Sequence, residues 1–402
     1  MNLYKINRYS VYIITILMVF KTALMEFNID MFIYFFTFLI IVANLFEFIF
    51  KGKIKSSISS VFILLIYSIF QLALTSIYNN VMYSLFSYMA VFLYILFWVL
   101  IINNQSSSLN YSLMKGYFKL NIVLGIVSSI LAIYQYYFDP SIFNLVVHNV
   151  YGNEEILLQG NVLRRTTALI GSPQSFSLYM GMVFGIVLFT KFPRKSIKLI
   201  LLAVLFIGGI LSGSRMFTVF IVILFLGYLF ENRNRLVKFL KPTYFILFGG
   251  IITLPFLELE NNNTVIRLLD FIGNWPALMI FFENFKFDSF YNVIFGHGLG
   301  YKDRIVYNFF GYEYQSVESY ILLLLLQQGI VGLVLFINIY TRAFYNSILK
   351  NRFVLYLLIA FLVNQLFVPA FSGLTFGFLG WGIIIYALSI NRDYKDDPKT
   401  LE

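Results

Sequence analysis

The sequence predicts an all-α polytopic membrane protein of about twelve helices. Of its 402 residues, 60% are hydrophobic and only 12% are charged, and the mean hydropathy is +0.81. A soluble domain of this length could not bury so much apolar surface. Several apolar runs reach the ~20 residues that a helix needs to cross the hydrocarbon core, and they lack the alternation of barrel strands.

Twelve apolar stretches are candidates for the spanning helices. They cover residues 9–24, 31–50, 59–78, 82–102, 120–138, 176–189, 197–211, 216–230, 243–257, 317–340, 353–369 and 371–390. The pairs on either side of Arg215 and Pro369 are short, so each is either two helices or one irregular element. The first stretch follows Lys5 and Arg8 as a signal peptide would, but no small-residue cleavage site follows it, and we expect it to be retained.

The basic residues predict the orientation, because Lys and Arg concentrate in cytoplasmic loops. When alternate loops are assigned to opposite sides, most of the 29 Lys and Arg residues fall on the same side as both termini. We therefore expect a multi-pass protein of the inner (plasma) membrane with cytoplasmic N and C termini. This topology accounts for the net charge of +10, and nucleic-acid binding is not needed to explain it.

The residues available for chemistry exclude several classes of site. There is no cysteine, and the only histidines are His148 and His297. Disulfides, thiolate metal ligands and thiol nucleophiles are therefore excluded, and a histidine-rich metal site is not expected. No carboxylate cluster suggests a metal held by oxygen ligands, so we expect neither a metal nor a cofactor.

Two connections on the predicted outer side are much longer than the others, at residues 139–165 and 258–316. Loops of this length are usually functional or disordered. The second contains an apolar and aromatic stretch, so we expect a partly helical outer domain between helices 9 and 10, on the membrane surface above a cavity between helices. Three regions result: five helices without motifs at 1–138, a catalytic-type region at 139–340, and two helices with a cytoplasmic tail at 341–402.

Two arginine clusters lie next to breaks in the apolar pattern. Arg164 and Arg165 precede a Gly/Ser/Pro break at 171–173, and Arg215 follows Ser-Gly-Ser between two short apolar stretches. A polar break at membrane depth is tolerated only where it is buried in protein or lines a cavity, and an ionisable residue there is a functional candidate. The alternative is structural, with the arginine pair reaching lipid phosphates and Arg215 anchoring a helix at the interface.

A third cluster joins a glycine-rich turn to the start of a helix. The turn contains Gly296, His297 and Gly298, and the helix begins near Glu318 and Tyr320. Glycines permit close approach of the backbone, but the G-x-G-x-G pattern lacks the strand context of a dinucleotide site. A carboxylate at a helix start is also favoured by the helix dipole, so Glu318 has a structural explanation beside a catalytic one.

In this order, the clusters resemble the O-antigen ligase/polymerase family, which includes the Wzy-type polymerases of lipid-linked polysaccharide repeats. The family pattern has an arginine before a G-x-x-P-N turn, T-x-S-R between two helices, a G-x-G in a large outer loop, and a helix start of the form H-N-x-Y/F-L followed by G-I/V-x-G. The matching residues are Arg165, Gly171, Pro173, Ser214, Arg215, Gly296, Gly298, Tyr320, Ile321, Gly329, Ile330 and Gly332. The resemblance covers roughly residues 164–337.

The resemblance implies a metal-independent transfer at the outer leaflet, in which a glycan moves from a polyprenyl-diphosphate donor to a sugar hydroxyl. It implies that Arg165 and Arg215 bind the diphosphate, with Arg164 as the alternative partner, because guanidinium groups clamp phosphate oxygens and stay charged. The implied partners are polyprenyl-diphosphate-linked oligosaccharides, the lipid bilayer, a chain-length regulator and a flippase.

The sequence departs from the family pattern in two places, mildly at Gln174, where the family often has Asn, and more strongly at the helix start. Glu318-Ser319 stands where ligases carry His-Asn, so the ligase base is missing at its position, and the difference favours a polymerase. The candidates for a general base are then Glu318 and His297. The other residues expected to contact substrate are Tyr320, Gly296 and Gly298.

Two other functions stay open from the sequence. An O-antigen ligase differs from the polymerase mainly at Glu318. A lipid-linked oligosaccharide flippase or another secondary transporter would also have about twelve helices, but internal repeats and short outer loops are typical of that class. No internal repeat is visible, and the first 150 residues contain no motif.

Overall fold

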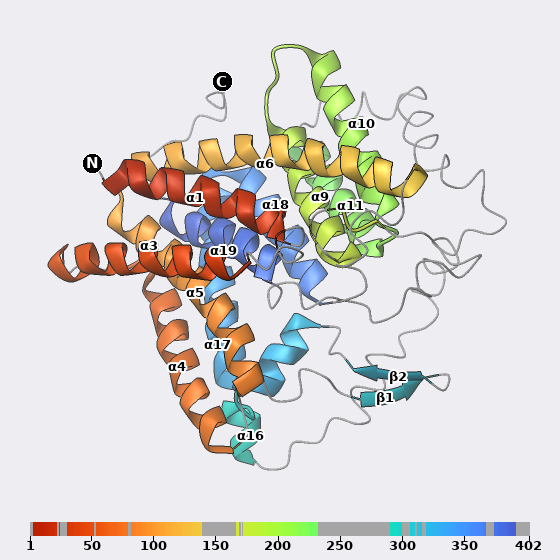
Figure 1. Cartoon of the computed structure of the whole chain (residues 1–402). Helices are drawn as coiled ribbons and strands as arrows, with labels where there is room; N and C mark the ends of the chain where they lie inside the picture. Colours follow the sequence, from red (N-terminus) through yellow and green to blue (C-terminus); the bar gives the residue numbers. More distant parts are fainter. Residues whose placement is uncertain are drawn as a thin grey trace. The chain divides into compact units, whose positions relative to one another are not determined.

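A computed structural model describes residues 3–21, 24, 30–51, 54–78, 82–138, 166–168, 170, 172–231, 290–299, 306–309, 312–315, 319–366 and 374–390. The chain divides into two compact units, one formed by Met1–Leu124 and Met279–Glu402 and the other by Gly125–Leu278. Helices make up most of the described part of both units (Figure 1), which confirms the helical fold class.

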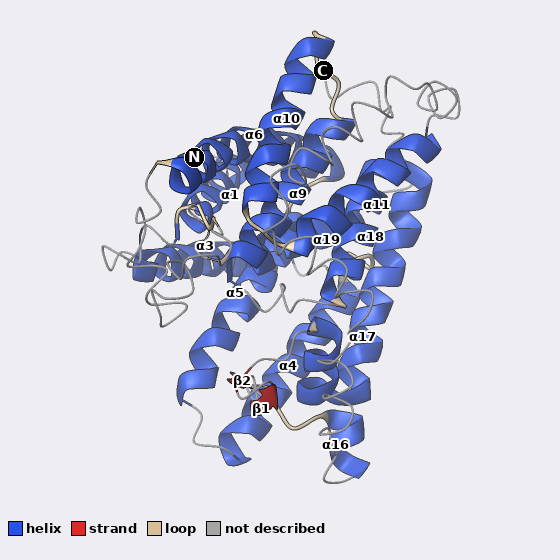
Figure 2. Cartoon of the chain, turned by 90° about the vertical axis from the view of Figure 1, so that its right-hand side faces the viewer, coloured by secondary structure: helices blue, strands red, loops and turns tan. Residues whose placement is uncertain are grey.

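The first unit contains elements from both ends of the chain. Its helices are α1 (Leu3–Val19), α3 (Asp30–Lys51), α4 (Ser59–Tyr78), α5 (Met82–Asn104), α16 (Phe290–Phe295), α17 (Tyr320–Lys350), α18 (Arg352–Gln365) and α19 (Leu374–Ser389). Helix α6 (Ser107–Tyr137) begins in this unit and ends in the other. Helices α4, α16 and α17 lie together in the lower part of Figure 2, although more than 200 residues separate α4 from α16 in sequence.

The described part of the predicted outer loop contains helix α16 and a β-hairpin. Strands β1 (Val306–Phe309) and β2 (Tyr312–Gln315) are antiparallel, with Val306 opposite Gln315 and Phe309 opposite Tyr312. The prediction of a partly helical loop holds for α16, but the all-α prediction missed the hairpin. Its only signal is the alternation of aromatic with polar residues in β2, which is weak over four residues; β1 has no such alternation.

Aromatic side chains form the core of the first unit. Trp98 of α5 is fully buried, and its ring lies 5.5 Å from that of Tyr117 and 5.3 Å from that of Phe378, between centroids. Its indole N–H donates to the Phe378 carbonyl at 2.9 Å. Gly382 of α19 makes this packing possible, because a Cβ there would lie 2.6 Å from atoms of the Trp98 ring. Helices α5 and α19 therefore pack at close range.

The second unit is built around helix α9 (Pro173–Phe189), with α10 (Lys195–Leu211) and α11 (Arg215–Glu231) beside it. Almost every residue of α9 is buried, as expected for an apolar helix inside a bundle. Glycines bring its neighbours close, since a Cβ at Gly181 would meet the ring of Phe220 and one at Gly209 would meet that of Phe217. Small residues play this role in membrane helix packing.

Two lysines predicted to be cytoplasmic also close helix ends. The amino group of Lys55 donates to the carbonyls of Ile102, at 2.6 Å, and Gln105 at the C-terminus of α5. The amino group of Lys198 donates to Leu188 O at 2.6 Å and to Thr190 O at 3.1 Å, at the C-terminus of α9. Cations are favoured at this end of a helix. These lysines therefore have a structural role in addition to the topological one.

The apolar helices are those of a membrane protein. Among the described residues, three helical stretches are long and apolar enough to cross a bilayer, namely Met31–Phe50, Ser107–Tyr137 and Tyr320–Ile348. Shorter apolar helices accompany them. One face of α3 exposes a row of apolar side chains, among them Phe35 (62% exposed), Phe46 (60%) and Ile49 (69%), which suits contact with lipid rather than water.

Most predicted stretches contain a helix, and one of these helices differs in shape from the prediction. Residues 243–257 lie outside the described residues, and every other stretch overlaps a helix. The pairs flanking Arg215 and Pro369 are separate helices, α10 with α11 and α18 with α19. Stretch 317–340 is not one straight spanning helix, because α17 folds at Gly329. Its residues after Gly329, 330–350, still extend for about 31 Å, enough to span.

Candidate functional site

The structure describes some of the predicted site residues. Glu318, Arg164 and Arg165 lie outside the described residues, and Arg215 is described only as the first residue of α11. The other predicted site residues all lie in the first compact unit. They are Gly296, His297, Gly298 and Tyr320.

Helix α17 folds back on itself at Gly329. This residue has φ 64° and ψ −166°, a conformation that only glycine adopts readily. The ring centroids of Tyr320 and Phe336 are consequently 5.5 Å apart, whereas a straight helix would separate these positions by about 24 Å. Helix α17 thus has a short arm, residues 320–328, and a long arm, residues 330–350.

The glycine turn, residues 296–298, supplies hydrogen bonds that the fold of α17 requires. The N–H of His297 donates to Leu326 O at 3.0 Å, and the N–H of Gly298 donates to Gln327 O at 3.0 Å. In an uninterrupted helix, these carbonyls would accept from residues four positions further along. Because a buried carbonyl without a donor is costly, the glycine turn and the folded conformation of α17 stabilise each other.

Both glycine motifs are needed for this contact. A Cβ at Gly296 would meet backbone atoms of Gln327 and Gln328, and one at Gly329 would meet the Ile294 carbonyl and the backbone nitrogen of Gly296. Gly296 also has φ 77°, in the left-handed region. The turn and the fold, both part of the sequence resemblance, therefore form one structure.

Helix α4 also contacts the glycine turn and the short arm of α17. The hydroxyl of Tyr67 lies 2.7 Å from Gln328 O and 3.1 Å from Phe295 O, so it contacts carbonyls on α17 and next to the turn. The amide nitrogen of Gln71 donates to the Tyr67 hydroxyl at 2.6 Å and to Phe295 O. We define the α4 clamp as Tyr67 and Gln71.

The turn orients the imidazole of His297. Its Nδ1 lies 3.3 Å from Leu326 O, and since a carbonyl can only accept, Nδ1 carries the hydrogen in this contact. In the neutral ring the lone pair is then on Nε2. The backbone of the short arm thus sets the orientation of the ring, and Nε2 is a buried atom.

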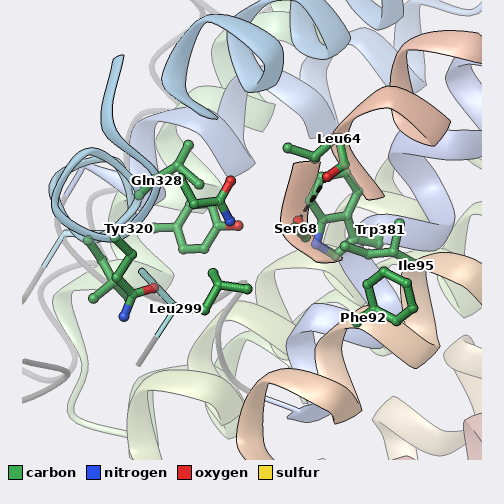
Figure 3. A pocket seen from close by; sticks show the side chains of 11 residues that line it. Leu64, Ser68, Phe92, Ile95, Leu299, Tyr320, Gln328 and Trp381 are labelled. Atoms are coloured by element: carbon green, nitrogen blue, oxygen red, sulfur yellow. Dashed lines mark hydrogen bonds between the residues drawn. The ribbon is translucent and has the colours of Figure 1, made fainter. Parts of the chain in front are cut away.

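A small cavity lies between the short arm and helices α4, α5 and α19, with about 50 Å³ of free space. Figure 3 shows Tyr320, Gln328 and Leu299 on one side of it, opposite residues of α4, α5 and α19. The opposite residues are Leu64, Ser68, Phe92, Ile95 and Trp381. The side-chain oxygen of Gln328 is buried and has no hydrogen-bond partner among the residues that the structure describes. None of the lining residues is charged, and the space would hold about four water molecules or one small polar group.

In the second unit, the segment after Arg165 joins the turn before Arg215. The N–H of Thr166 donates to Leu211 O at 3.0 Å, where α10 ends. The chain then turns through Ser212, whose hydroxyl donates to Gly209 O at 2.6 Å, and α11 begins at Arg215. The structure thus brings together parts of the two arginine clusters, which are about fifty residues apart in sequence.

A glutamine of α6 holds the same segment. The side-chain oxygen of Gln135 accepts the N–H groups of Thr167 and Ala168, both at 3.1 Å. Ala168 is fully buried with φ 44°, a strained conformation for a residue with a Cβ. Backbone strain of this kind persists only where the surroundings impose it, and it clusters at functional sites.

The sequence interpretation missed the side chains that support the two clusters. Tyr67, Gln71 and Gln135 carry no motif. Their signal is the presence of polar groups inside apolar helices, and for Tyr67 and Gln71 also the four-residue spacing that places both on one helix face. Such residues face protein or a cavity more often than lipid.

No known family model matches the chain, and no curated protein matches it.

Proposed function

We propose that this protein polymerises lipid-linked oligosaccharide repeat units of a capsule or an O-antigen at the outer face of the plasma membrane. The supporting observation is that the four parts of the family pattern, which lie in the three sequence clusters, are joined in pairs. The glycine turn is hydrogen-bonded to the fold at Gly329, and Thr166, which follows Arg165, is hydrogen-bonded to the end of the helix before Arg215. If the matches to the family pattern were accidental, there would be no reason to expect hydrogen bonds between them.

The proposed reaction is a glycosyl transfer. The acceptor hydroxyl oxygen bonds to the anomeric carbon of the donor sugar, the bond from that carbon to the diphosphate breaks, and the hydroxyl proton passes to a base. The diphosphate leaves on the polyprenyl lipid. Arg165 and Arg215 stabilise the charge that develops on it, with Arg164 as the alternative partner.

Arginine-to-lysine substitution tests the diphosphate contact, because lysine keeps the charge but loses the two-pronged geometry. We expect Arg165→Lys and Arg215→Lys each to shorten the polymer at equal expression. Arg342→Lys, at an exposed position of α17, is the matched control and should leave the polymer length unchanged. Normal polymer length in both site variants would contradict the role of these arginines.

His297 or Glu318 accepts the proton. His297 is the described candidate, since the backbone fixes the tautomer that leaves Nε2 as the acceptor. If His297 is the base, His297→Ala should reduce the rate ~10²-fold or more. If Glu318 is the base, Glu318→Gln should cause a loss of the same size. Full activity in both variants would leave a site that works through arginine electrostatics alone.

The proposed topology has twelve spans and both termini in the cytoplasm. Lys55 and Lys198, both on the predicted inner side, close the C-terminal ends of α5 and α9. In the proposed topology these two helices run from the outer to the inner face, so the two contacts are consistent with it.

The lipid-linked glycans of a deletion strain decide between the candidate functions. Loss of a polymerase should leave single repeat units on the lipid, displayed at the outer face. Full-length lipid-linked chains would instead indicate a ligase, and single repeats retained at the inner face would indicate a flippase. Either of the last two profiles would refute the polymerase.

A further inference from the structure

We propose that Tyr67 and Gln71, the α4 clamp, are positioning residues of the glycosyl-transfer site. They hold the glycine turn, and with it His297, against the folded α17. This role rests on the proposed function and extends it to residues 1–138, the region that carries no motif.

The first argument is that the clamp contacts both partners of the structure that it joins. The Tyr67 hydroxyl reaches Gln328 O, on the short arm, and Phe295 O, at the residue before the turn. Gln71 contacts the hydroxyl and the same Phe295 carbonyl. A residue that only satisfied one buried group would not link the two elements.

The second argument is that the clamp completes the set of donors at the fold. Three successive carbonyls of the short arm accept hydrogen bonds from outside α17. Leu326 O and Gln327 O accept from the turn, and Gln328 O accepts from Tyr67. Since irregular backbone inside an apolar body must find its partners in the protein, the third carbonyl depends on α4.

The third argument concerns His297. Both its backbone N–H and its Nδ1 contact Leu326 O, two residues before the carbonyl that Tyr67 contacts. Displacement of the turn from the short arm would therefore release the orientation of the imidazole. A loss of alignment affects the chemical step more than the binding of a substrate held elsewhere.

Docking of the turn can be measured without enzyme activity, because the chain contains no cysteine. Leu299 directly follows the turn and is only 4% exposed, so Leu299→Cys provides a single buried thiol. In the purified full-length protein, we expect N-ethylmaleimide to label this thiol about tenfold faster when Tyr67→Phe or Gln71→Leu is added, because the docked state loses a buried hydrogen bond. Tyr345→Phe removes a hydroxyl from an exposed tyrosine and should leave labelling unchanged.

The positioning role is measured in proteins without the reporter cysteine. The substrate is the lipid-linked repeat unit extracted from the deletion strain, supplied to the reconstituted enzyme. Tyr67→Phe and Gln71→Leu should each lower kcat about tenfold and leave KM for the lipid-linked substrate within about twofold. A purely structural defect would reduce the amount of folded protein without this separation of kcat from KM.

The outcomes separate the two proposals. Unchanged labelling in both clamp variants would overturn the clamp, and faster labelling with an unchanged kcat would overturn its positioning role. If the wild-type enzyme does not lengthen the lipid-linked units at all, the proposed function fails, while the labelling experiment still decides whether α4 holds the turn.

Discussion

Replacement of Gly329 by alanine should straighten α17. In the present conformation an alanine would be strained by about 1–3 kcal/mol. Its Cβ would also overlap the Ile294 carbonyl and the backbone nitrogen of Gly296, which are backbone atoms that move together with the turn. If the turn separates, two short-arm carbonyls, Leu326 O and Gln327 O, lose the donors that the turn supplies, at about 1 kcal/mol each. The folded conformation would therefore lose about 3–5 kcal/mol, while a straight helix gains about 1 kcal/mol from alanine in place of glycine.

This change has a direct distance signature. Spin labels on cysteines introduced at Leu322 and Ile337 should be about 22 Å apart, measured along the helix axis, if α17 is straight, and markedly closer in the wild type. The same variant should lose polymerisation, because His297 no longer has its backbone partner. Gly116→Ala is the control, since the three atoms nearest to its Cβ all belong to the end of the Tyr12 side chain, which can move. A wild-type distance together with full-length polymer in the Gly329 variant would refute the reasoning.

Three further predictions concern stability and topology. Lys198→Met should lower the free energy of unfolding of the protein in detergent by about 1 kcal/mol, because the carbonyls at the end of α9 lose a charged donor. In thermal unfolding, Gln135→Leu should lower the midpoint, since two buried N–H groups lose their acceptor, whereas Ala168→Gly should raise it or leave it unchanged by relieving the strain at φ 44°. A cysteine at Ser57 should react with a membrane-impermeant maleimide only after permeabilisation, and one at Asn153 should react in intact cells. Labelling of Ser57 from outside would contradict the predicted orientation.

The positions of the helices could be predicted because apolar length is a local property of the sequence. Helix α9 also shows a local start signal, with the Ser172 hydroxyl accepting from the N–H of Ser175 and a proline at the first helical position. The fold at Gly329 could not be predicted in the same way. A glycine within a leucine-rich run is compatible with a straight helix, and its conformation here depends on the turn near Gly296 and on Tyr67, both remote in sequence.

The contact between the glycine turn and α17 was predictable to the extent that its glycines form a recognisable pattern. The sequence indicated that Gly296 and Gly298 permit close approach of the backbone, and the structure identifies the backbone they approach, that of the short arm. The supporting side chains of α4 and α6 were not predicted, because their signal, a polar group inside an apolar helix, does not say which contact Gln71 or Gln135 makes. Their importance arises only from the tertiary contacts.

The fold of α17 also constrains how the outer loop and the helical body can vary. Inside an apolar body, a helix can break only where other parts of the protein replace its missing hydrogen bonds. Here the loop supplies two of the three external donors, through His297 and Gly298, and α4 supplies the third through Tyr67. A change in the loop that moves the turn therefore acts on the conformation of α17, and a change in α4 acts on the loop. The three segments form one unit of structure, although α4 is separated from the other two by more than 200 residues of sequence.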